Sequence, residues 1–342
     1  MLQQFFILAA VCYAIYIISN QLDLVGGRLG NYLNLSDEVV ASTFQALATS
    51  GPEILMAIIV ATPFISQSIW VDLSLAERAC SGTLNMAFSA MDNLLGIGAV
   101  AIVFMLITKK VDPNEIIESD INTIFSLAFY TLISLVFVIF CFDYKLTYIE
   151  SWILMILGIV FVVIEVVIKR KEAQDVTERK ETVIKRMKGT AWNGLQYSFL
   201  IFALIVFVKI AMSASFNLAL LGSISIGSIV LLFTSYISSF PEFVFSFKYA
   251  IEGRKKALLG ILFGSNIIDL AFAGFRSIWL HEEMLICTTG KFPKLLFLYL
   301  SIIPIIACIM LISISSKFLK WKHAYVGIVI YLIYIISGFI LL

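Results

Sequence analysis

Residues 238–242 read Ser-Ser-Phe-Pro-Glu and lie inside a long apolar run of the sequence. Residues 49–53 read Thr-Ser-Gly-Pro-Glu and also lie inside an apolar run. Each segment places a carboxylate, Glu242 or Glu53, where hydrocarbon is expected. Such a placement costs roughly 2.5–3.5 kcal/mol on membrane-insertion scales unless a partner or a ligand offsets it. The same order of residues, two hydroxyl residues followed by x-Pro-Glu, occurs twice despite this cost, which indicates a duplicated functional site.

A second polar segment follows each of these motifs along the chain. Residues 265–269 begin with Ser and end with Asp, and residues 89–93 begin with Ser and end with Asn. In both Pro-Glu motifs the two hydroxyl residues precede the Glu by four and three positions. Side chains spaced by three or four residues lie on one face of a helix. The sequence therefore predicts four helices that present hydroxyls, carboxylates and an amide.

The composition is that of an integral membrane protein with many spans. The chain has 342 residues, of which 61% are hydrophobic and 14% are charged, whereas soluble domains average about 25% charged residues. The net charge of +1 says nothing about nucleic-acid or acidic partners, but no basic patch with interleaved aromatic residues is present, so no nucleic-acid partner is expected. The five cysteines are scattered without metal-ligand spacing, so no disulfide framework or metal cofactor is expected.

Ten apolar segments predict an all-α protein with ten transmembrane helices, because about 20 residues cross the hydrocarbon. The first is interpreted as a span rather than a signal peptide, since it lacks a basic leading region. Proline interrupts two of the longer segments, at Pro52 and Pro241, and such breaks are tolerated in a membrane only against protein, water or an ion. The segments lie near residues 3–20, 40–66, 83–107, 121–142, 150–168, 195–215, 222–250, 257–280, 294–315 and 324–342.

A charged stretch divides the ten segments into two sets of five. Residues 169–188 carry eight Lys or Arg and four acids. We expect a first five-helix repeat over 1–168, a charged linker over 169–192 and a second repeat over 193–342. Since five is odd, the second copy must insert upside down relative to the first. The Lys and Arg bias of the loops predicts that both termini lie outside and that the linker is cytoplasmic.

The predicted ligands in the two motifs are hard oxygen donors. Carboxylates, hydroxyls, an amide and carbonyls freed by proline suit calcium, which takes six to eight oxygens at about 2.3–2.6 Å. Sodium suits the same kind of cage. A transition metal would favour imidazole or thiolate, and neither His nor Cys lies near the motifs.

The segments ALATSGPE, SSFPEF and FGSNIID resemble the two alpha repeats of the sodium/calcium exchanger superfamily of cation/calcium antiporters. The first repeat departs from the usual form, because Phe88-Ser89-Ala90 stands where Gly-Ser-Asn is typical. The resemblance implies a central cation site built from both repeats, with weaker candidates in the carbonyls of Ala46 and Ser235 and in Asp92, which is only about 100° from Asn93 around a helix. The main candidates are Thr49, Ser50, Glu53, Ser89, Asn93, Ser238, Ser239, Glu242, Ser265 and Asp269.

The resemblance implies a secondary antiporter, not an enzyme, that exchanges sodium for calcium across a membrane by alternating access. Its partners would be the lipid bilayer and the two transported ions, with no cofactor and no obligatory protein partner. The absence of large regulatory domains favours a plasma membrane. A proton/calcium antiporter of the same superfamily is the alternative. An intramembrane hydrolase with paired acids is a distant third, because the sequence has no Gly-x-Gly-Asp segment or zinc motif.

Overall fold

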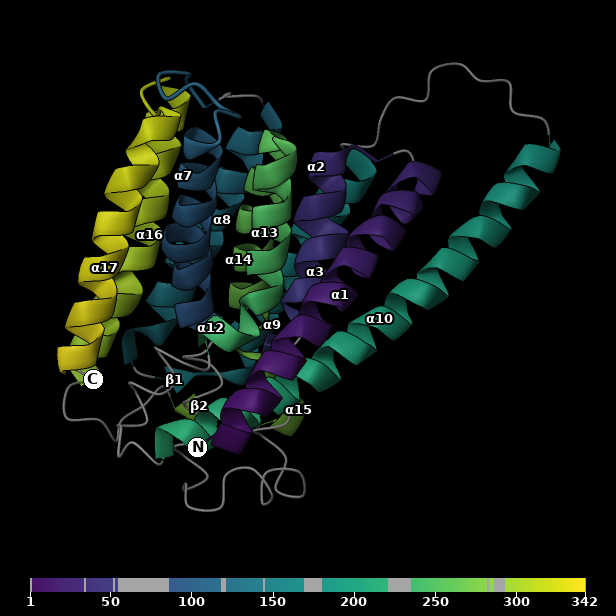
Figure 1. The fold of residues 1–342 in the computed structure, drawn as a ribbon. Coiled ribbons are helices and arrows are strands. Elements are labelled where there is room, and N and C mark those ends of the chain that lie inside the picture. The colour runs from purple at the N-terminus through teal and green to yellow at the C-terminus, as the bar shows by residue number, and fades with distance from the viewer. Residues whose placement is uncertain are drawn as a thin grey trace.

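The computed structural model describes residues 2–33, 35–51, 53–54, 86–117, 121–143, 145–168, 180–220, 235–281, 283–285 and 293–341. Nearly all of these residues are helical (Figure 1). In the first half the elements are α1 (Leu2–Leu33), α2 (Asp37–Val40), η1 (Ala41–Gln45), α3 (Ala46–Thr49), η2 (Asp92–Gly98), α7 (Ala99–Ile107), α8 (Ile121–Phe140), η3 (Cys141–Asp143), β1 (Lys145–Leu146), α9 (Tyr148–Val163) and η4 (Ile164–Ile168).

The second half has the same character. Its elements are α10 (Lys180–Leu220), α12 (Ser235–Ser238), α13 (Phe240–Glu252), α14 (Lys255–Phe272), α15 (Phe275–Leu280), β2 (Met284–Leu285), α16 (Pro293–Ser315), η6 (Trp321–His323) and α17 (Ala324–Leu341). The two short strands pair antiparallel. Three of the η elements, η1, η2 and η4, are π-helical, a local form that is frequent at functional sites.

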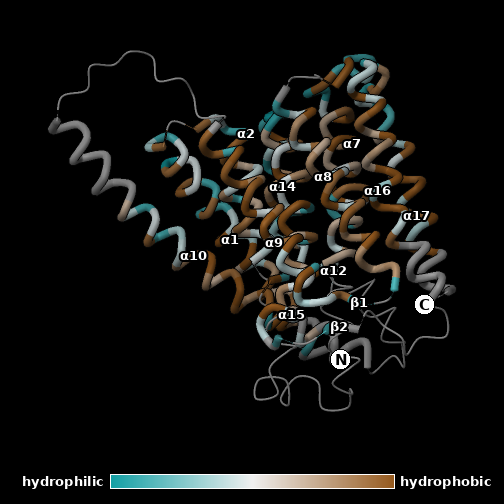
Figure 2. The backbone as a smooth tube through the Cα atoms, turned by 180° about the vertical axis from the view of Figure 1, so that it is seen from behind, coloured by the Kyte–Doolittle hydropathy of each residue, from teal (hydrophilic) through white to brown (hydrophobic). Residues whose placement is uncertain are grey.

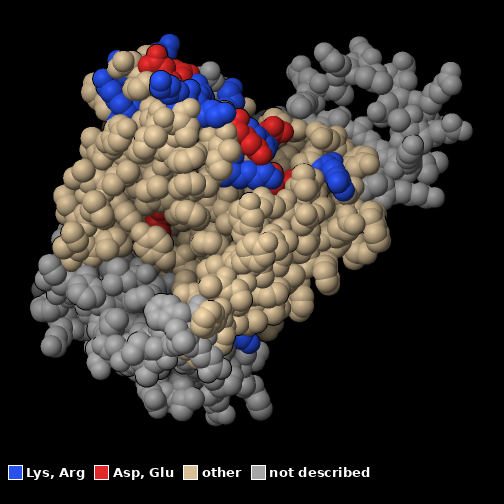
Figure 3. Space-filling view, in the orientation of Figure 1, with Lys and Arg blue, Asp and Glu red and all other residues tan. Residues whose placement is uncertain are grey.

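Six described helices are long and apolar enough to cross a membrane, and two shorter apolar helices lie near the C-terminus. The six spans are Phe6–Leu33, Met86–Ile107, Asn122–Asp143, Tyr148–Val167, Ala191–Ala211 and Lys255–Trp279. Figure 2 shows hydrophobic residues along the lengths of these helices. Among the described residues that Figure 3 colours, the charged side chains gather mainly at the end of the molecule opposite the two chain termini. The chain is therefore a multi-pass integral membrane protein.

Helix α14 is the centre of the bundle. The share of buried residues is 89% in its span and only 22% in the span of α10. Helix α14 packs against α8, α9, α13 and the segment from α2 to α3. Two glycines on one face permit the last contact, because a Cβ on Gly264 would lie 2.3 Å from the Ser42 carbonyl oxygen and one on Gly260 would lie 2.8 Å from the Glu38 carbonyl oxygen.

Helices α1 and α10 lie side by side on the outside of the bundle, and Figure 1 shows them slanted relative to its other helices. Helix α1 is held to α13 by an ion pair between the partly exposed Lys248 and the buried Asp23, in which Lys248 Nζ lies 2.6 Å from Asp23 Oδ2. The Gln45 amide donates to the other Asp23 oxygen at 2.6 Å, and the Tyr249 hydroxyl donates to it at 3.0 Å. This cluster connects three elements of the fold.

Side-chain caps and one glycine define several helix ends. The Ser36 hydroxyl accepts from the Val39 amide at the start of α2, as N-caps do. Thr147 and Glu150 form a capping box at the start of α9. Helix α13 ends at Gly253, whose φ of +73° lies in the left-handed region that glycine adopts without strain.

One predicted boundary differs from the structure. The first helix was expected over 3–20, but α1 continues to Leu33, because the apolar pattern resumes after Asp23 and no proline follows it. The charged segment that divides the chain was expected over 169–192 as a helix or a linker; its residues from Lys180 onward are part of the continuous helix α10, and the division into two repeats stays a prediction. Parts of the second, third and seventh predicted segments fall on 55–85 and 221–234, which lie outside the described residues. The ten-helix inverted repeat stays a prediction.

Candidate cation site

The two Pro-Glu motifs interrupt their helices in the same way. Helix α3 ends at Thr49, and Ser50 has φ −76° and ψ −4°. Helix α12 ends at Ser238, and Ser239 has φ −81° and ψ 5°. Both serines lie close to the sparsely populated bridge region, where many active-site residues are found. The breaks predicted from proline are thus present, with matching backbone geometry.

The hydrogen bonds of the two motifs also match. In the first motif the Thr49 hydroxyl at 3.1 Å and the Ser50 amide at 2.9 Å donate to the Ala46 carbonyl. In the second motif the corresponding distances to the Ser235 carbonyl are 3.0 and 2.9 Å. A carbonyl oxygen has two lone pairs, so both of these carbonyls are already fully used in this conformation. They would bind a cation only if the hydroxyls turned away.

Both motif glutamates are completely buried. Glu53 and Glu242 have no exposed surface. Glu242 lies in the first turn of α13, directly after Pro241. Proline is suited to this position because the missing N–H has no partner there anyway, and a carboxylate near a helix N-terminus is stabilised by the helix dipole. The sequence order Pro-Glu therefore starts a helix with an acid at its positive end.

Ser89 connects the two halves of the chain. Its hydroxyl lies 2.6 Å from the Ser239 hydroxyl. It is also 3.3 Å from Glu53 Oε1 and 3.3 Å from Asp269 Oδ2, as a donor to either carboxylate. One hydroxyl thus contacts groups from both Pro-Glu motifs and from α14, which the sequence placed in one site.

Further contacts between the halves surround Ser89. The Asn93 amide donates to Asp269 Oδ2 at 3.5 Å, and the Ser50 hydroxyl donates to the Ser265 carbonyl at 3.4 Å. Thr49 lies beside Glu242, and Ser238 lies beside Glu53, so one hydroxyl of each motif lies beside the acid of the other motif. All ten main candidate residues are buried. The structure brings them together around one small volume.

The site contains carboxylate oxygens without a hydrogen-bond donor. Among the described residues, no hydrogen bond of normal length and angle is made to either oxygen of Glu242, to Glu53 Oε2 or to Asp269 Oδ1, although the Thr49 hydroxyl lies beside Glu242, and none is made to Asn93 Oδ1. No ion pair joins these acids to a Lys or Arg in the described part of the chain. Buried polar atoms are nearly always hydrogen-bonded, and close carboxylates repel one another. The site is therefore chemically incomplete without cations or protons.

Acids alone do not form a metal cluster here. In the described ranges, no group of three His, Cys, Asp or Glu side chains is arranged to hold a metal ion. A cation at this site would need the hydroxyls of Ser89 and the two motifs, the Asn93 amide oxygen and the acids together. This mixed set of hard oxygens fits calcium or sodium.

Asp92 and Asn93 are the first two residues of the π-helix η2, and their side chains have different neighbours. Both side chains are buried at its first turn. Asn93 faces Asp269, whereas Asp92 accepts a hydrogen bond from the Tyr331 hydroxyl of α17 at 2.6 Å. The two adjacent side chains therefore point to different neighbours. The sequence alone did not decide which of them faces the acids of the site.

Sequence reasoning did not include three buried polar residues near the site. Asn266 follows Ser265, and neither its amide nitrogen nor its oxygen has a partner among the described residues. Tyr130 of α8 lies close to Asp269. Tyr331 contacts Asp92. Asn266 was visible in the FGSNIID segment, but no sequence signal marks the tyrosines, which come from other helices.

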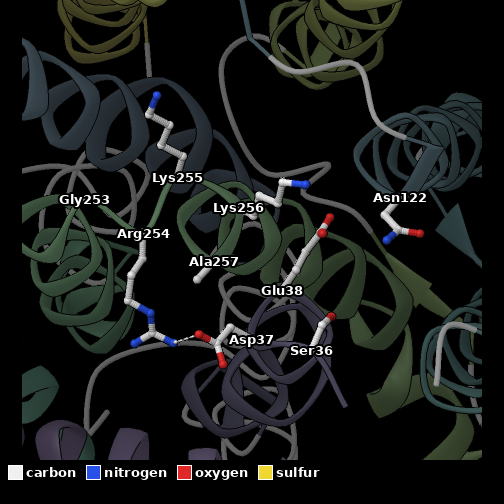
Figure 4. A pocket seen from close by; sticks show the side chains of 9 residues that line it. All are labelled: Ser36, Asp37, Glu38, Asn122, Gly253, Arg254, Lys255, Lys256 and Ala257. Atoms are coloured by element: carbon white, nitrogen blue, oxygen red, sulfur yellow. Dashed lines mark ion pairs between the residues drawn. The ribbon is translucent and has the colours of Figure 1, made fainter. Parts of the chain in front are cut away.

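A second polar pocket, with a volume of about 590 Å³, lies at the charged end of the molecule. Figure 4 shows Arg254 paired with Asp37 across it, at 3.3 Å, and Lys255, Lys256 and Glu38 at its walls. Because basic and acidic groups alternate there, the pocket has no clear preference for a cation or an anion. It is separate from the buried acids described above.

Comparisons with known proteins agree with this geometry. The family model described as sodium/calcium exchanger protein matches residues 3–167. No curated protein sequence matches the chain.

The chain is also similar to solved structures of the sodium-calcium exchanger NCX_Mj. With the form soaked in 2.5 mM Na+ and 1 mM Sr2+ the TM-score is 0.71 at 19% identity, over 98% of each chain. With the form soaked in 2.5 mM Na+ and 0.1 mM Ca2+ the TM-score is 0.69 at 17% identity, over 98% of this chain and 97% of that one. With the form free of both Na+ and Ca2+ the TM-score is 0.61 at 17% identity, over 96% and 99%. Residues 3–167 therefore resemble the family of sodium/calcium exchanger proteins, and the whole chain has the same fold as NCX_Mj.

Proposed function

We propose that this protein is a secondary antiporter that exchanges sodium for calcium by alternating access. The observation that carries the proposal is the set of buried carboxylate oxygens without donors around Ser89, where two broken helices meet. Broken helices at matching places in two halves of a chain are typical of transporter binding sites. The fold shared with NCX_Mj, whose structures were soaked with sodium, calcium and strontium, supports the same function.

The cations would be bound by oxygens from both halves. The acids Glu53, Glu242 and Asp269 supply the charge, and Ser89 and Asn93 supply neutral oxygens between them. The remaining motif hydroxyls, on Thr49, Ser50, Ser238, Ser239 and Ser265, complete the proposed site. Asp92 is not included, because it faces Tyr331 rather than Asp269. The carbonyls of Ala46 and Ser235 are not included, because each already accepts from a motif hydroxyl and a motif amide.

Mutual exclusion is the physical basis of exchange in this proposal. Calcium and sodium would need the same oxygens, so they cannot occupy the site together. The empty site holds three carboxylates in close proximity, and their repulsion disfavours a change of side without bound ions. The carrier therefore moves between its two states when loaded with either ion.

The orientation in the membrane is also proposed. Charged side chains gather at the end opposite the termini (Figure 3), and positively charged loops remain on the cytoplasmic side. We place this end in the cytoplasm, both termini outside and the protein in a plasma membrane. The accessibility of single cysteines introduced at Lys110 and Lys145, which lie in loops predicted to face opposite sides, tests this arrangement.

Direct binding to purified protein tests the proposal. Calorimetric titration with calcium should give weaker apparent affinity as sodium rises, in a competitive pattern, and Glu242→Gln should bind neither ion at this site. Calcium binding that is unaffected by sodium but weakened by acid would favour the proton/calcium antiporter instead.

A further inference from the structure

Asp92 is a buried carboxylate with surroundings of its own. It has no exposed surface. The Tyr331 hydroxyl donates to its Oδ1 at 2.6 Å, and the same hydroxyl contacts that of Tyr236. Ser235 also lies beside it. The second oxygen, Oδ2, has no hydrogen-bond partner among the described residues, and no described Lys or Arg forms an ion pair with Asp92.

A glycine makes room for this arrangement. Gly96 lies four residues after Asp92 and so on the same helix face. A Cβ on Gly96 would lie 2.8 Å from the Tyr331 ring carbon Cζ. The absence of a side chain there lets the tyrosine hydroxyl reach the carboxylate. The Asp92 cluster is thus built by the packing of α17 on η2 rather than by an accidental contact.

The residues of this cluster range from partly exposed to fully buried. Tyr236 is 37% exposed, whereas Tyr331 is only 6% exposed and Asp92 is fully buried. The two tyrosine hydroxyls and the carboxylate therefore form a polar chain from the partly exposed Tyr236 of α12 to Asp92 in the first turn of η2. The hydroxyl oxygens of the two tyrosines and the carboxylate oxygens of Asp92 could bind a cation that has lost its water, and such polar groups inside a membrane often mark ion sites.

We propose that Asp92, Tyr331, Tyr236 and Ser235 form a second cation site that binds sodium, separate from the cage around Ser89. The site offers one carboxylate and otherwise neutral oxygens, so its charge matches a monovalent ion. Calcium sites in proteins usually gather several carboxylates. The absence of imidazole and thiolate from this set disfavours a transition metal. A buried carboxylate needs a counter-charge, and a sodium ion at Oδ2 supplies it.

The site is particular to one half of the chain. Asn93 corresponds in position to Asp269, so Asp92 corresponds to Ile268. The first half therefore carries an acid one position earlier, turned away from the cage and towards α17. Sodium at Asp92 would not compete for the cage oxygens, and it would remain bound when calcium occupies the cage. This inference rests on the proposed function only for the identity of the ion in the cage.

Equilibrium dialysis of purified protein with radioactive sodium tests the inference, because binding is measured without transport. At saturating calcium, the unmodified protein should retain a bound sodium ion, and Asp92→Asn should lose it. Tyr331→Phe should weaken this binding by about tenfold, the loss expected for one hydrogen-bonding group next to a charge. Tyr325→Phe, a change on the exposed face of the same helix, should have no effect.

Two further results separate the outcomes. Glu242→Gln should abolish the sodium binding that calcium displaces and keep the calcium-insensitive ion, so a failure of the exchange proposal would not remove the Asp92 result. If Asp92→Asn does not fold, Tyr331→Phe carries the test alone. Calcium-insensitive sodium that persists in Asp92→Asn and Tyr331→Phe, or that is absent from the unmodified protein, would overturn the inference.

Discussion

The Ser89 hydroxyl lies 2.6 Å from the Ser239 hydroxyl, although the residues are 150 positions apart in the chain. This contact joins the span after the first motif to the break in the second motif. Because Ser89 also reaches Glu53 and Asp269, it is the point at which the two halves share one set of oxygens. The properties of the site should therefore depend on this small side chain.

Ser89→Ala should weaken calcium binding by about tenfold, since it removes a hydroxyl from among charged groups. Isothermal titration of purified protein measures this change. Ser134→Ala is a matched control, because Ser134 is equally buried but donates only to the Thr131 carbonyl of its own helix. Equal calcium affinity in the two variants would show that Ser89 is not part of the site.

Glu53→Gln and Glu242→Gln should each abolish calcium exchange while the protein stays folded. Each change removes one charge and keeps the shape of the side chain. Neither should lower the melting temperature in detergent, because burial of an unpaired carboxylate opposes folding, and Glu242 at both oxygens and Glu53 at Oε2 have no hydrogen-bond partner among the described residues. Glu115→Gln, which breaks an ion pair with Lys255 at the charged end, should leave exchange intact. Unfolding of both cage variants would indicate a structural role for these acids.

Gly264→Ala should destabilise the protein by about 1–3 kcal/mol, the usual range for overpacking. The added methyl would meet the Ser42 backbone and push α14, which carries Asp269, away from η1. Gly194→Ala is the control, because nothing lies within 4 Å of its added Cβ. That substitution should stabilise α10 by about 0.5–1 kcal/mol. Thermal unfolding in detergent compares the two, and equal melting temperatures would contradict the close packing.

Lys248→Met should destabilise the protein by about 1.5–3 kcal/mol, the range for a lost hydrogen bond to a charged group, because Asp23 keeps only the longer ion pair with Arg254 at 3.8 Å. Lys145→Met breaks the pair with Glu283, whose side chains are 46% and 59% exposed. Exposed pairs contribute little, so this control should melt like the unmodified protein. Similar melting of both variants would show that the Asp23 cluster does not stabilise the contact of α1 with α13.

Acid should inhibit exchange by competition. A proton on Glu53, Glu242 or Asp269 neutralises a charge that the cation needs, so the apparent affinity for calcium should fall as pH falls, with the maximal rate restored by more calcium. Exchange rates measured at several calcium concentrations and pH values test this. Inhibition that calcium does not relieve would place the effect of acid elsewhere.

The sequence predicted the parts of the site that follow from local spacing. Proline in an apolar run predicted the breaks, and spacings of three and four predicted which side chains share a face. Both are visible at Ser50 and Ser239, whose backbone angles agree within 9°. The resemblance of the short motifs to the sodium/calcium exchanger superfamily implied that the four helices meet at one site.

Other features depend on distant packing and had no local signal. Asp92 and Asn93 are adjacent, so helix periodicity could not decide which one faces the acids, and the π-helix that begins there changes the usual spacing. Tyr331 reaches Asp92 from 239 positions away. The length of α1 was underestimated because Asp23 looks like the end of a span, whereas Lys248 of α13 neutralises it inside the bundle.

The most direct test of the exchange account is calcium flux in proteoliposomes that contain the purified protein. Vesicles loaded with sodium should accumulate radioactive calcium when diluted into sodium-free medium, and Glu242→Gln vesicles should not. If more than two sodium ions leave for each calcium, an imposed membrane potential should change the rate. Calcium uptake of equal rate without internal sodium, or uptake driven only by a pH gradient, would contradict sodium/calcium exchange.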